Sequence, residues 1–181
     1  SHRTPIVEER VKKLCENLKV CLNREHLIEL VSKLENMEVE VQPEPFDDCL
    51  NTLKELSKQY KLAITSDAIY TPGEGIRKIL SHNGMLGFFE CFSFSNEVGY
   101  SKPHKEIFLN TLRGLNLNSG EVIHVGDRFY NDVLGGKRSG LKTVWLNLRD
   151  REKGGETLEV NADFEIRSLS ELPQVLKKVS T

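Results

Sequence analysis

The sequence predicts an α/β protein with a Rossmann-like, three-layer core, in which helices cover both faces of a parallel sheet. Short apolar runs alternate with helical patterns from about residue 46 onward, and this alternation is typical of βαβ units. The runs around Ile64 and Val122-Ile123 carry no charge, as expected for parallel strands that are buried on both faces. A length of 181 residues suggests one domain with a small appendage.

The appendage is predicted over residues 1–40, as a partial helical cap of two amphipathic helices. These helices need another surface to cover their apolar faces. Apolar residues recur at helical spacing over about 5–18, where Pro5 suits a first helical turn. Asn23 is a good N-cap for the second helix. Over 37–45 Val39 and Val41 alternate with acids, so we expect a linker with a short exposed strand.

Residues 41–181 predict the α/β core. Its first helix, over 46–60, directs four apolar side chains inward: Phe46, Leu50, Leu53 and Leu56. Trp145 should pack against a helix, and Ser170 should cap the last helix. The further helices are expected over 73–82, 105–115, 131–139 and 170–178. The strands are expected over 62–65, 92–94, 122–125, 142–147 and 164–166.

Composition excludes several classes of protein. Hydrophobic residues make up 38% and charged residues 29% of the chain, the balance of a soluble globular protein. The net charge of -2 gives no electrostatic footprint for nucleic acid. The apolar runs are too short to cross a bilayer, and the N-terminal residues do not resemble a signal peptide. We therefore expect no nucleic-acid or membrane partner.

The four cysteines indicate a reducing compartment. They are Cys15, Cys21, Cys49 and Cys91. They form no C-x-x-C pair and match no zinc spacing. Reduced thiols in a cytoplasmic protein are expected, with Cys15 and Cys21 as packing residues of the helical segment.

The most informative motif follows the apolar run that ends at Val125. The run stops abruptly at Gly126-Asp127, and Asp132 stands where the next helix begins. Ligands of open α/β sheets bind just beyond the carboxyl ends of the strands. Two carboxylates at that edge suit a hard cation such as Mg²⁺, whereas solvated acids at a turn are the alternative for the motif alone.

Two further polar residues occur at comparable places. Ser66 ends the apolar run over 62–65, and Lys102 precedes Pro103 just before a helical pattern. Ser66, Lys102 and Asp127, in this order and spacing, resemble the second, third and fourth motifs of the haloacid dehalogenase-like (HAD) hydrolases. The resemblance extends from about Pro43 to the C-terminus.

The resemblance implies that a phosphoryl group passes from substrate to an aspartate and then to water, with Mg²⁺ as cofactor. Ser66 would donate a hydrogen bond to the phosphoryl oxygens, and Lys102 would balance the charge on nucleophile and phosphoryl group. Asp127 would ligate Mg²⁺. Asp132 would hold a metal-bound water or orient Lys102. A glycine before Asp127 and an acid after it resemble the Mg²⁺-dependent phosphatases of the family more than its dehalogenases.

Five neighbouring residues have less defined roles. Arg128 and Asn131 lie close enough in sequence to support the site. Asp67 stands where the family more often has Asn or Gly, and its role is open. His124 lies inside a strand, where a hydrogen-bonded core histidine is more common than a ligand. His104 is expected to cap a helix or to be exposed.

The first motif of the family has no counterpart in the sequence. That motif is an apolar strand ending in Asp-x-Asp-x-Thr or similar, and it supplies the nucleophile and the general acid. Asp47-Asp48 is adjacent rather than alternating. In the resembling fold the missing strand lies between those carrying Ser66 and Asp127, so its loss leaves two rows of unpaired backbone groups.

Three explanations fit this gap. We expect that the sequence lacks a segment that the native protein has. Alternatively, the strand comes from another chain, and an incomplete sheet makes oligomers through strand exchange conceivable. The third explanation is a degenerate relative that binds without catalysis.

We therefore predict a HAD-like phosphatase that requires Mg²⁺ and acts on a small phosphorylated metabolite. The 181 residues alone should be inactive, because the nucleophile is absent from them. The alternative is a non-catalytic binding or regulatory module on the same fold. A phospho-acceptor regulator of the flavodoxin-like kind fits less well, since it has no cap.

Overall fold

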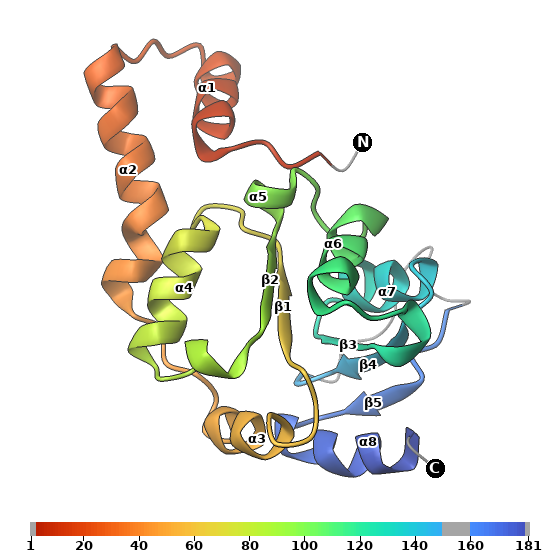
Figure 1. Ribbon diagram of the computed structural model, residues 1–181. Coiled ribbons are helices and arrows are strands. Elements are labelled where there is room, and N and C mark those ends of the chain that lie inside the picture. The colour runs from red at the N-terminus through yellow and green to blue at the C-terminus, as the bar shows by residue number, and fades with distance from the viewer. Residues whose placement is uncertain (1–2, 150–159, 180–181) are drawn as a thin grey trace.

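The computed structural model describes residues 3–149 and 160–179 (Figure 1). Over this part of the chain no helix is both long and apolar enough to span a membrane. The α-helices are α1 (Val7–Leu18), α2 (Arg24–Val41), α3 (Cys49–Leu56), α4 (Gly73–His82), α5 (Ser95–Val98), α6 (Lys105–Leu115), α7 (Gly135–Arg138) and α8 (Leu172–Val179). Short 3-10 helices cover Leu86–Phe88 (η1), Ser119–Glu121 (η2) and Leu169–Glu171 (η5), and a π-helical turn, η3, covers Phe129–Leu134.

Every strand pairing is parallel among the described residues, which confirms the predicted α/β class. Strand β1 (Ala63–Ser66) pairs with β2 (Cys91–Phe94), and their last residues, Ser66 and Phe94, are aligned. The second sheet has the order β3-β4-β5, formed by Ile123–Gly126, Lys142–Leu146 and Phe164–Ile166. Parallel strands have their carboxyl ends at the same edge of a sheet. Ser66 is the last residue of β1 and Gly126 the last residue of β3, so each lies at such an edge of its own sheet.

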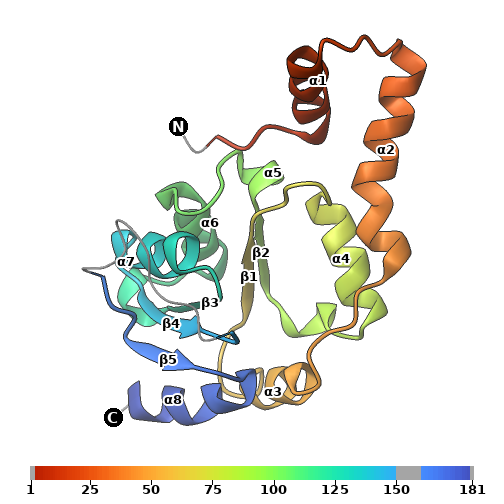
Figure 2. The same cartoon turned by 180° about the vertical axis from the view of Figure 1, so that it is seen from behind.

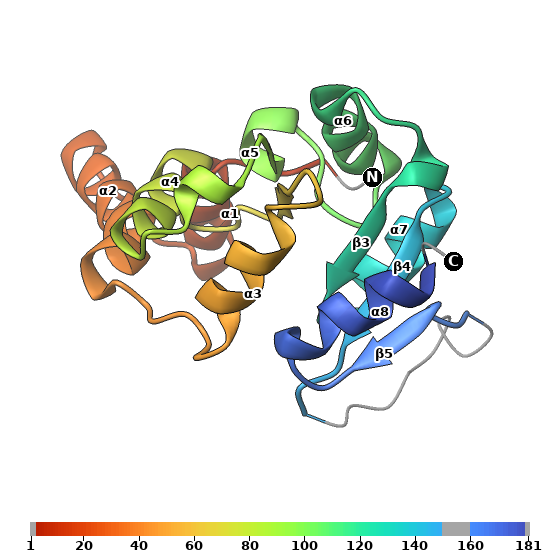
Figure 3. The ribbon, with the colours of Figure 1, turned by 60° about the horizontal axis from the view of Figure 1, so that its bottom comes forward.

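Helices cover the second sheet on both faces, giving it three layers (Figure 3). On one face Val144 and Ile166 pack with Leu56 of α3 and Leu172 of α8. The opposite face is covered by η3 with α7. Helix α6, whose Ile107 and Phe108 are buried, packs on β1 and β2 of the first sheet and on α7. As predicted, Trp145 packs against a helix, with its ring 4.8 Å from that of Phe129 in η3.

The two sheets remain separate. Among the described residues, no strand pairing joins β1 to β3, and Figures 1 and 2 show the β1-β2 pair standing apart from β3-β4-β5. An apolar groove of about 370 Å³ is lined among others by Leu62, which precedes β1, by Ile123 and Val125 of β3 and by Leu176 of α8. In the described structure β1 and β3 each lack a neighbouring strand on one side.

Helices α1 and α2 extend away from the sheets (Figure 1). They pack on each other, and α2 also packs on α4. As predicted, Asn23 caps α2 and accepts a hydrogen bond from the His26 N–H at 2.8 Å. The segment before α1 is attached to the residue after α5, because the Thr4 N–H donates a hydrogen bond to the carbonyl of Gly99 at 3.0 Å.

The strand predicted around Val39 and Val41 is wrong, because α2 continues to Val41. Two valines among glutamates are too short a pattern to tell a strand from a helix. Extending an existing helix adds one hydrogen bond for each residue fixed. Val39 lies close to Gly75 of α4, so the helix also gains a packing contact, while Val41 remains 73% exposed.

Three smaller predictions also fail. Helix α3 begins only at Cys49, and Phe46 is 57% exposed instead of inward-facing. The cap of the C-terminal segment is Ser168, whose side chain accepts from the Ser170 N–H at 3.1 Å, so Ser170 is not the cap. Cys21 is exposed and does not pack in the interior. Each of these residues lies near the end of a helical segment, where the sequence pattern does not locate the boundary of the element.

Two phenylalanines provide a test of this packing. Phe108 is 1% exposed and lies edge-on to His124, with ring centroids 5.1 Å apart. We expect Phe108→Ala to lower the free energy of unfolding by about 3–5 kcal/mol, because the cavity cannot fully collapse. Phe46→Ala is the matched control and should change it by less than about 0.5 kcal/mol. Urea unfolding measures both; equal effects would contradict the described core.

Candidate active site

A buried ion pair lies where β3 ends. The ammonium of Lys102 is 2.6 Å from Oδ1 of Asp132, and the two side chains are only 12% and 2% exposed. His124 Nε2 is 3.0 Å from the same carboxylate oxygen. The backbone N–H of Arg128 donates to Oδ2 of Asp132 at 2.9 Å. The carboxylate of Asp132 is thus held by the lysine, the histidine and a backbone group together.

The local sequence explains how Asp132 reaches this position. Asp132 lies in η3, the π-helical turn that follows the Gly126-Asp127 corner. Its carboxyl group packs directly against Gly126, where any Cβ would overlap it. Side chains two residues apart in a strand share a face, so His124 and Gly126 both face Asp132. Gly126 is therefore required here for space.

The protonation state of Asp132 follows from its surroundings. Burial alone would raise the pKa of its carboxyl group, because a charge is poorly solvated there. The hydrogen bond from His124 and the charge of Lys102 act in the opposite direction and prevail. The pKa of Asp132 is consequently well below its ordinary value. Asp132 is an anion at neutral pH, and the His124 nitrogen that faces it is a donor.

The backbone of Lys102 is held separately from its ammonium. Asp67 Oδ1 accepts a hydrogen bond from the Lys102 N–H at 2.8 Å. The amide of Asn131 donates to the Lys102 carbonyl at 3.0 Å and to Asp67 Oδ2 at 3.1 Å. Arg128 Nη1 lies 3.9 Å from Asp67 Oδ2. Asp67 directly follows Ser66, so these contacts join the end of β1 to the lysine and to η3.

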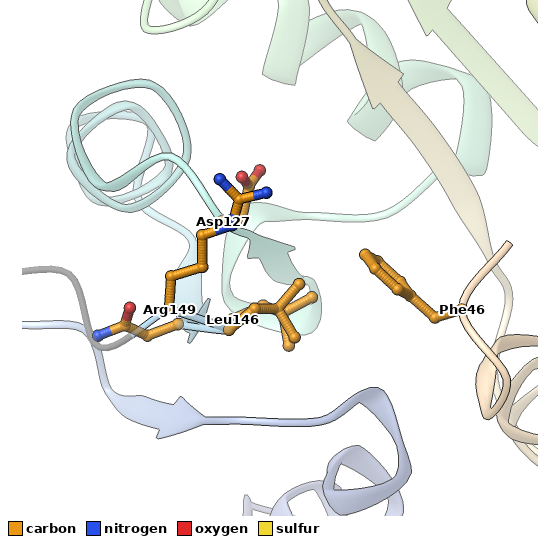
Figure 4. Close-up of a pocket in the computed structure, with 6 residues that line it drawn as sticks. Phe46, Asp127, Leu146 and Arg149 are labelled. Atoms are coloured by element: carbon orange, nitrogen blue, oxygen red, sulfur yellow. The ribbon is translucent and has the colours of Figure 1, made fainter. Parts of the chain in front are cut away.

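Asp127 lies at the other side of the Gly126 corner and lines a different pocket. Its carbonyl accepts a hydrogen bond from Trp145 Nε1 at 3.1 Å. The pocket measures about 310 Å³ and is also lined by Phe46, Leu146, Asn147, Leu148 and Arg149. In Figure 4 the Arg149 side chain extends toward Asp127, and Phe46 faces the pocket from the opposite side. Asp127 is an exposed residue.

The donor set around Asp127 fits a hard cation only in part. A carboxylate oxygen is the ligand type that Mg²⁺ prefers, and Mg²⁺ commonly keeps several waters beside one or two carboxylates. Over residues 3–149 and 160–179, however, no three His, Cys, Asp or Glu side chains are grouped closely enough to hold a metal ion by themselves. Asp132 is engaged by Lys102 and His124.

Of the predicted site residues, Lys102 and Asp132 are in direct contact, which is the geometry needed for Asp132 to orient the lysine. Ser66 is the last residue of β1, and Asp127 directly follows β3, a strand of the other sheet. His104 caps α6, with Nδ1 accepting from the Glu106 N–H at 3.2 Å, one of its two predicted positions.

Two residues of the site were not recognised from the sequence. His124 has the hydrogen bond expected of a core histidine, but its partner is the carboxylate that holds Lys102. Its spacing of two residues from Gly126 was the available signal, since it places both on one face of the strand. For Asp67 the sequence offered only its position after a strand end.

The parallel α/β fold is that of the haloacid dehalogenase-like (HAD) hydrolases. The sequence model of the family described as haloacid dehalogenase-like hydrolase matches residues 4–146, and the chain belongs to that family. Several of the relatives are named as phosphatases.

This chain aligns with only part of each relative. Residues of this chain are 35% identical over 128 positions to a glyceraldehyde 3-phosphate phosphatase of Pyrococcus furiosus, covering 70% of this chain and 52% of that protein. They are 37% identical over 100 positions to the Escherichia coli pyrimidine 5'-nucleotidase YjjG, covering 55% of this chain and 43% of that protein. The chain spans about half the length of these relatives.

A solved structure shows the same fold. The crystal structure of a HAD phosphatase from Thermococcus onnurineus superposes with a TM-score of 0.68 and 29% sequence identity, covering 91% of this chain and 69% of that one. Its agreement over most of the described chain supports a Rossmann-like α/β core.

The buried ion pair predicts a specific dependence of stability on pH. Asp132→Asn leaves the Lys102 ammonium without its anion, so we expect the free energy of unfolding at pH 7 to fall by about 3–5 kcal/mol. The folded-state pKa of Asp132 lies below the unfolded value, so below about pH 4 the unfolded chain binds the proton first. The stability that Asp132 contributes is therefore full above about pH 4 and is lost as the pH falls further.

Urea unfolding of wild type and Asp132→Asn from neutral pH to about pH 3 tests this. The difference between the two proteins should shrink toward the acid end. The exposed Asp47→Asn is the control, and its difference from wild type should stay near zero at neutral pH. A constant difference across the whole range would contradict the assignment of the ion pair.

Proposed function

We propose that this chain is part of a Mg²⁺-dependent phosphatase that acts on a small phosphorylated metabolite through an aspartyl-phosphate intermediate. The observation that carries the proposal is the Lys102–Asp132 pair, held at the end of β3 beside the segment that follows Ser66. A lysine that is held in place at a strand end suits the charge of a phosphoryl group. The nucleophile, a second aspartate, comes from residues outside this sequence.

The unpaired strand edges support the position of that nucleophile. An apolar groove is lined by Leu62, just before β1, and by Val125 of β3. In the described structure β1 and β3 each lack a neighbour on one side, and the named strands all pair in parallel. An apolar parallel strand between them would satisfy both rows of backbone groups. Its carboxyl end would then lie between Ser66 and Asp127, which is where an attacking carboxylate is needed. Residues 41–181 would form the core around it, and residues 1–40 part of a helical cap.

The side chains present would divide the work among them. Ser66 would donate a hydrogen bond to a phosphoryl oxygen, and Lys102 would balance the charge on the phosphoryl group and nucleophile. Asp132 would keep Lys102 in place, and Asp127 would hold Mg²⁺ with ligands from the added strand and water. When bound, Mg²⁺ would supply positive charge that offsets the phosphate and the aspartate. The cap helices would restrict access of water to the site.

The substrate class rests on the relatives. Their names refer to glyceraldehyde 3-phosphate and to pyrimidine 5'-nucleotides, which are both small phosphate esters. We extend that class to this chain without choosing a member of it. All four cysteines are free, as suits the reducing cytoplasm in which we place the reaction.

One observation favours a second candidate, a binding or regulatory module without catalysis. The sequence contains no apolar strand that ends in Asp-x-Asp. A module of this kind would keep the Lys102–Asp132 pair for binding phosphate groups and would have no use for a nucleophile. Adding the strand distinguishes the two candidates.

The experiment restores the strand in the same polypeptide. Arg3 forms an antiparallel bridge with Tyr100, which follows β2 and α5, so the described chain starts near the end of β2 (Figure 1). A strand that ends at that edge can therefore be fused ahead of Arg3 through a flexible Gly/Ser linker. The fused segment is an apolar strand ending in Asp-x-Asp. Hydrolysis of p-nitrophenyl phosphate is measured with and without Mg²⁺.

We expect the 181-residue chain alone to be inactive and the fusion to be active only with Mg²⁺. Changing the first strand aspartate to Asn, Lys102→Met or Asp127→Asn in the fusion should each reduce kcat by about 100-fold or more. Hydrolysis by the chain alone that Asp127→Asn abolishes would place the nucleophile within this sequence. A well-folded fusion that binds phosphate without hydrolysis would favour the binding module.

A further inference from the structure

The segment that carries Lys102 is held from two sides by residues other than the ion pair. Asp67 accepts the Lys102 N–H at 2.8 Å, and Asn131 donates to the Lys102 carbonyl at 3.0 Å. The same Asn131 amide donates to Asp67 at 3.1 Å, which closes the ring of contacts around the lysine backbone. We call Asp67 and Asn131 the backbone clamp.

We propose that Asp67 is a positioning residue that, through the backbone clamp, fixes where the Lys102 side chain starts. Asp132 fixes the ammonium, 2.6 Å away. A flexible four-carbon side chain reaches one defined point only when both of its ends are fixed. Asp67 itself does not touch the ammonium in the contacts described, so its effect on the site passes through Lys102.

The chemistry of the clamp requires an aspartate. Its two oxygens face three donor groups: the Lys102 N–H, the Asn131 amide and, at 3.9 Å, the Arg128 guanidinium. A carboxylate accepts from all of them, whereas an asparagine would turn an N–H₂ group toward one of these donors. The Asp67 side chain is 9% exposed, so water has little access to compensate for the mismatch.

The clamp also links three separate parts of the chain. Asp67 follows β1, Lys102 precedes α6, and Asn131 belongs to η3 after β3. Strands β1 and β3 are in different sheets and are not paired with each other in the described structure. The clamp and the ion pair are therefore polar connections that hold the two strand ends at one place.

The consequence for catalysis rests on the proposed function. Positioning errors of about 1 Å at a charged group can cost on the order of 100-fold in rate. The position of Lys102 itself can be measured without any activity, by the accessibility of its amine. Reductive methylation of folded protein, followed by mass spectrometry of peptides, reports each lysine separately. Lys54, exposed on α3, serves as the internal reference.

We expect Asp67→Asn and Asp67→Ala to raise the methylation rate of Lys102 relative to Lys54 by about tenfold, as charged hydrogen bonds are lost. Asp163→Asn is the matched control. Asp163 accepts a backbone N–H from Thr143 at 2.7 Å and an ammonium from Lys137 at 2.6 Å, far along the chain from the site. Asp163→Asn should leave the Lys102 rate unchanged.

Asn131→Ala, which removes only the second half of the clamp, should give a smaller rise and provides a test if both Asp67 variants fail to fold. An unchanged Lys102 rate in the folded variants would overturn the proposal. So would an equal rise in Asp163→Asn, since that would indicate general loosening.

The same variants in the active fusion separate this inference from the proposed function. Asp67→Asn should lower kcat by about tenfold or more, with a smaller change in KM. If methylation of Lys102 rises while no fusion hydrolyses phosphate, the clamp stands and the proposed function fails. If the fusion is active and neither methylation nor kcat responds to Asp67, the clamp fails and the proposed function stands.

Discussion

The rest of the site depends on the pairing of one buried ammonium with one buried carboxylate. Removing Lys102 and Asp132 from water costs several kcal/mol for each ion, and their attraction offsets this only with good geometry and further hydrogen bonds. His124 and the Arg128 N–H supply those hydrogen bonds. The requirement explains the glycine at 126, because any side chain there would displace the Asp132 carboxylate.

Much of this arrangement could be predicted from the sequence, since it depends on local patterns. The run before Gly126-Asp127 is long and apolar enough to identify β3, and α4 and α6 match their expected bounds because their apolar spacing is regular. Val39 and Phe46 were misassigned because their environment is set by contacts with distant segments. His124 and Asp67 required the tertiary structure, since a hydrogen-bond partner 8 or 35 residues away leaves no periodic signal.

Because the two sheets are separate, polar contacts between side chains and backbone hold the ends of β1 and β3 relative to each other. In a continuous parallel sheet, backbone hydrogen bonds hold adjacent strand ends in register. Here β1 and β3 are not paired with each other, and the described connections between their ends run through Asp67, Lys102, Asn131 and Asp132. A strand between β1 and β3 would add backbone hydrogen bonds to both, so the geometry around Lys102 should become more rigid once that strand is present.

The charges at this edge give the physical reason for a divalent cation in the proposed function. The positive charge of Lys102 is already balanced by Asp132, at 2.6 Å. An incoming phosphate and an aspartate nucleophile would each add negative charge at the same place, and like charges in a site of low dielectric repel strongly. One lysine cannot offset both, because it is shared with Asp132. A cation at the exposed Asp127 carboxylate would supply the missing positive charge, and the Asp127 position at the corner after β3 is where it is needed.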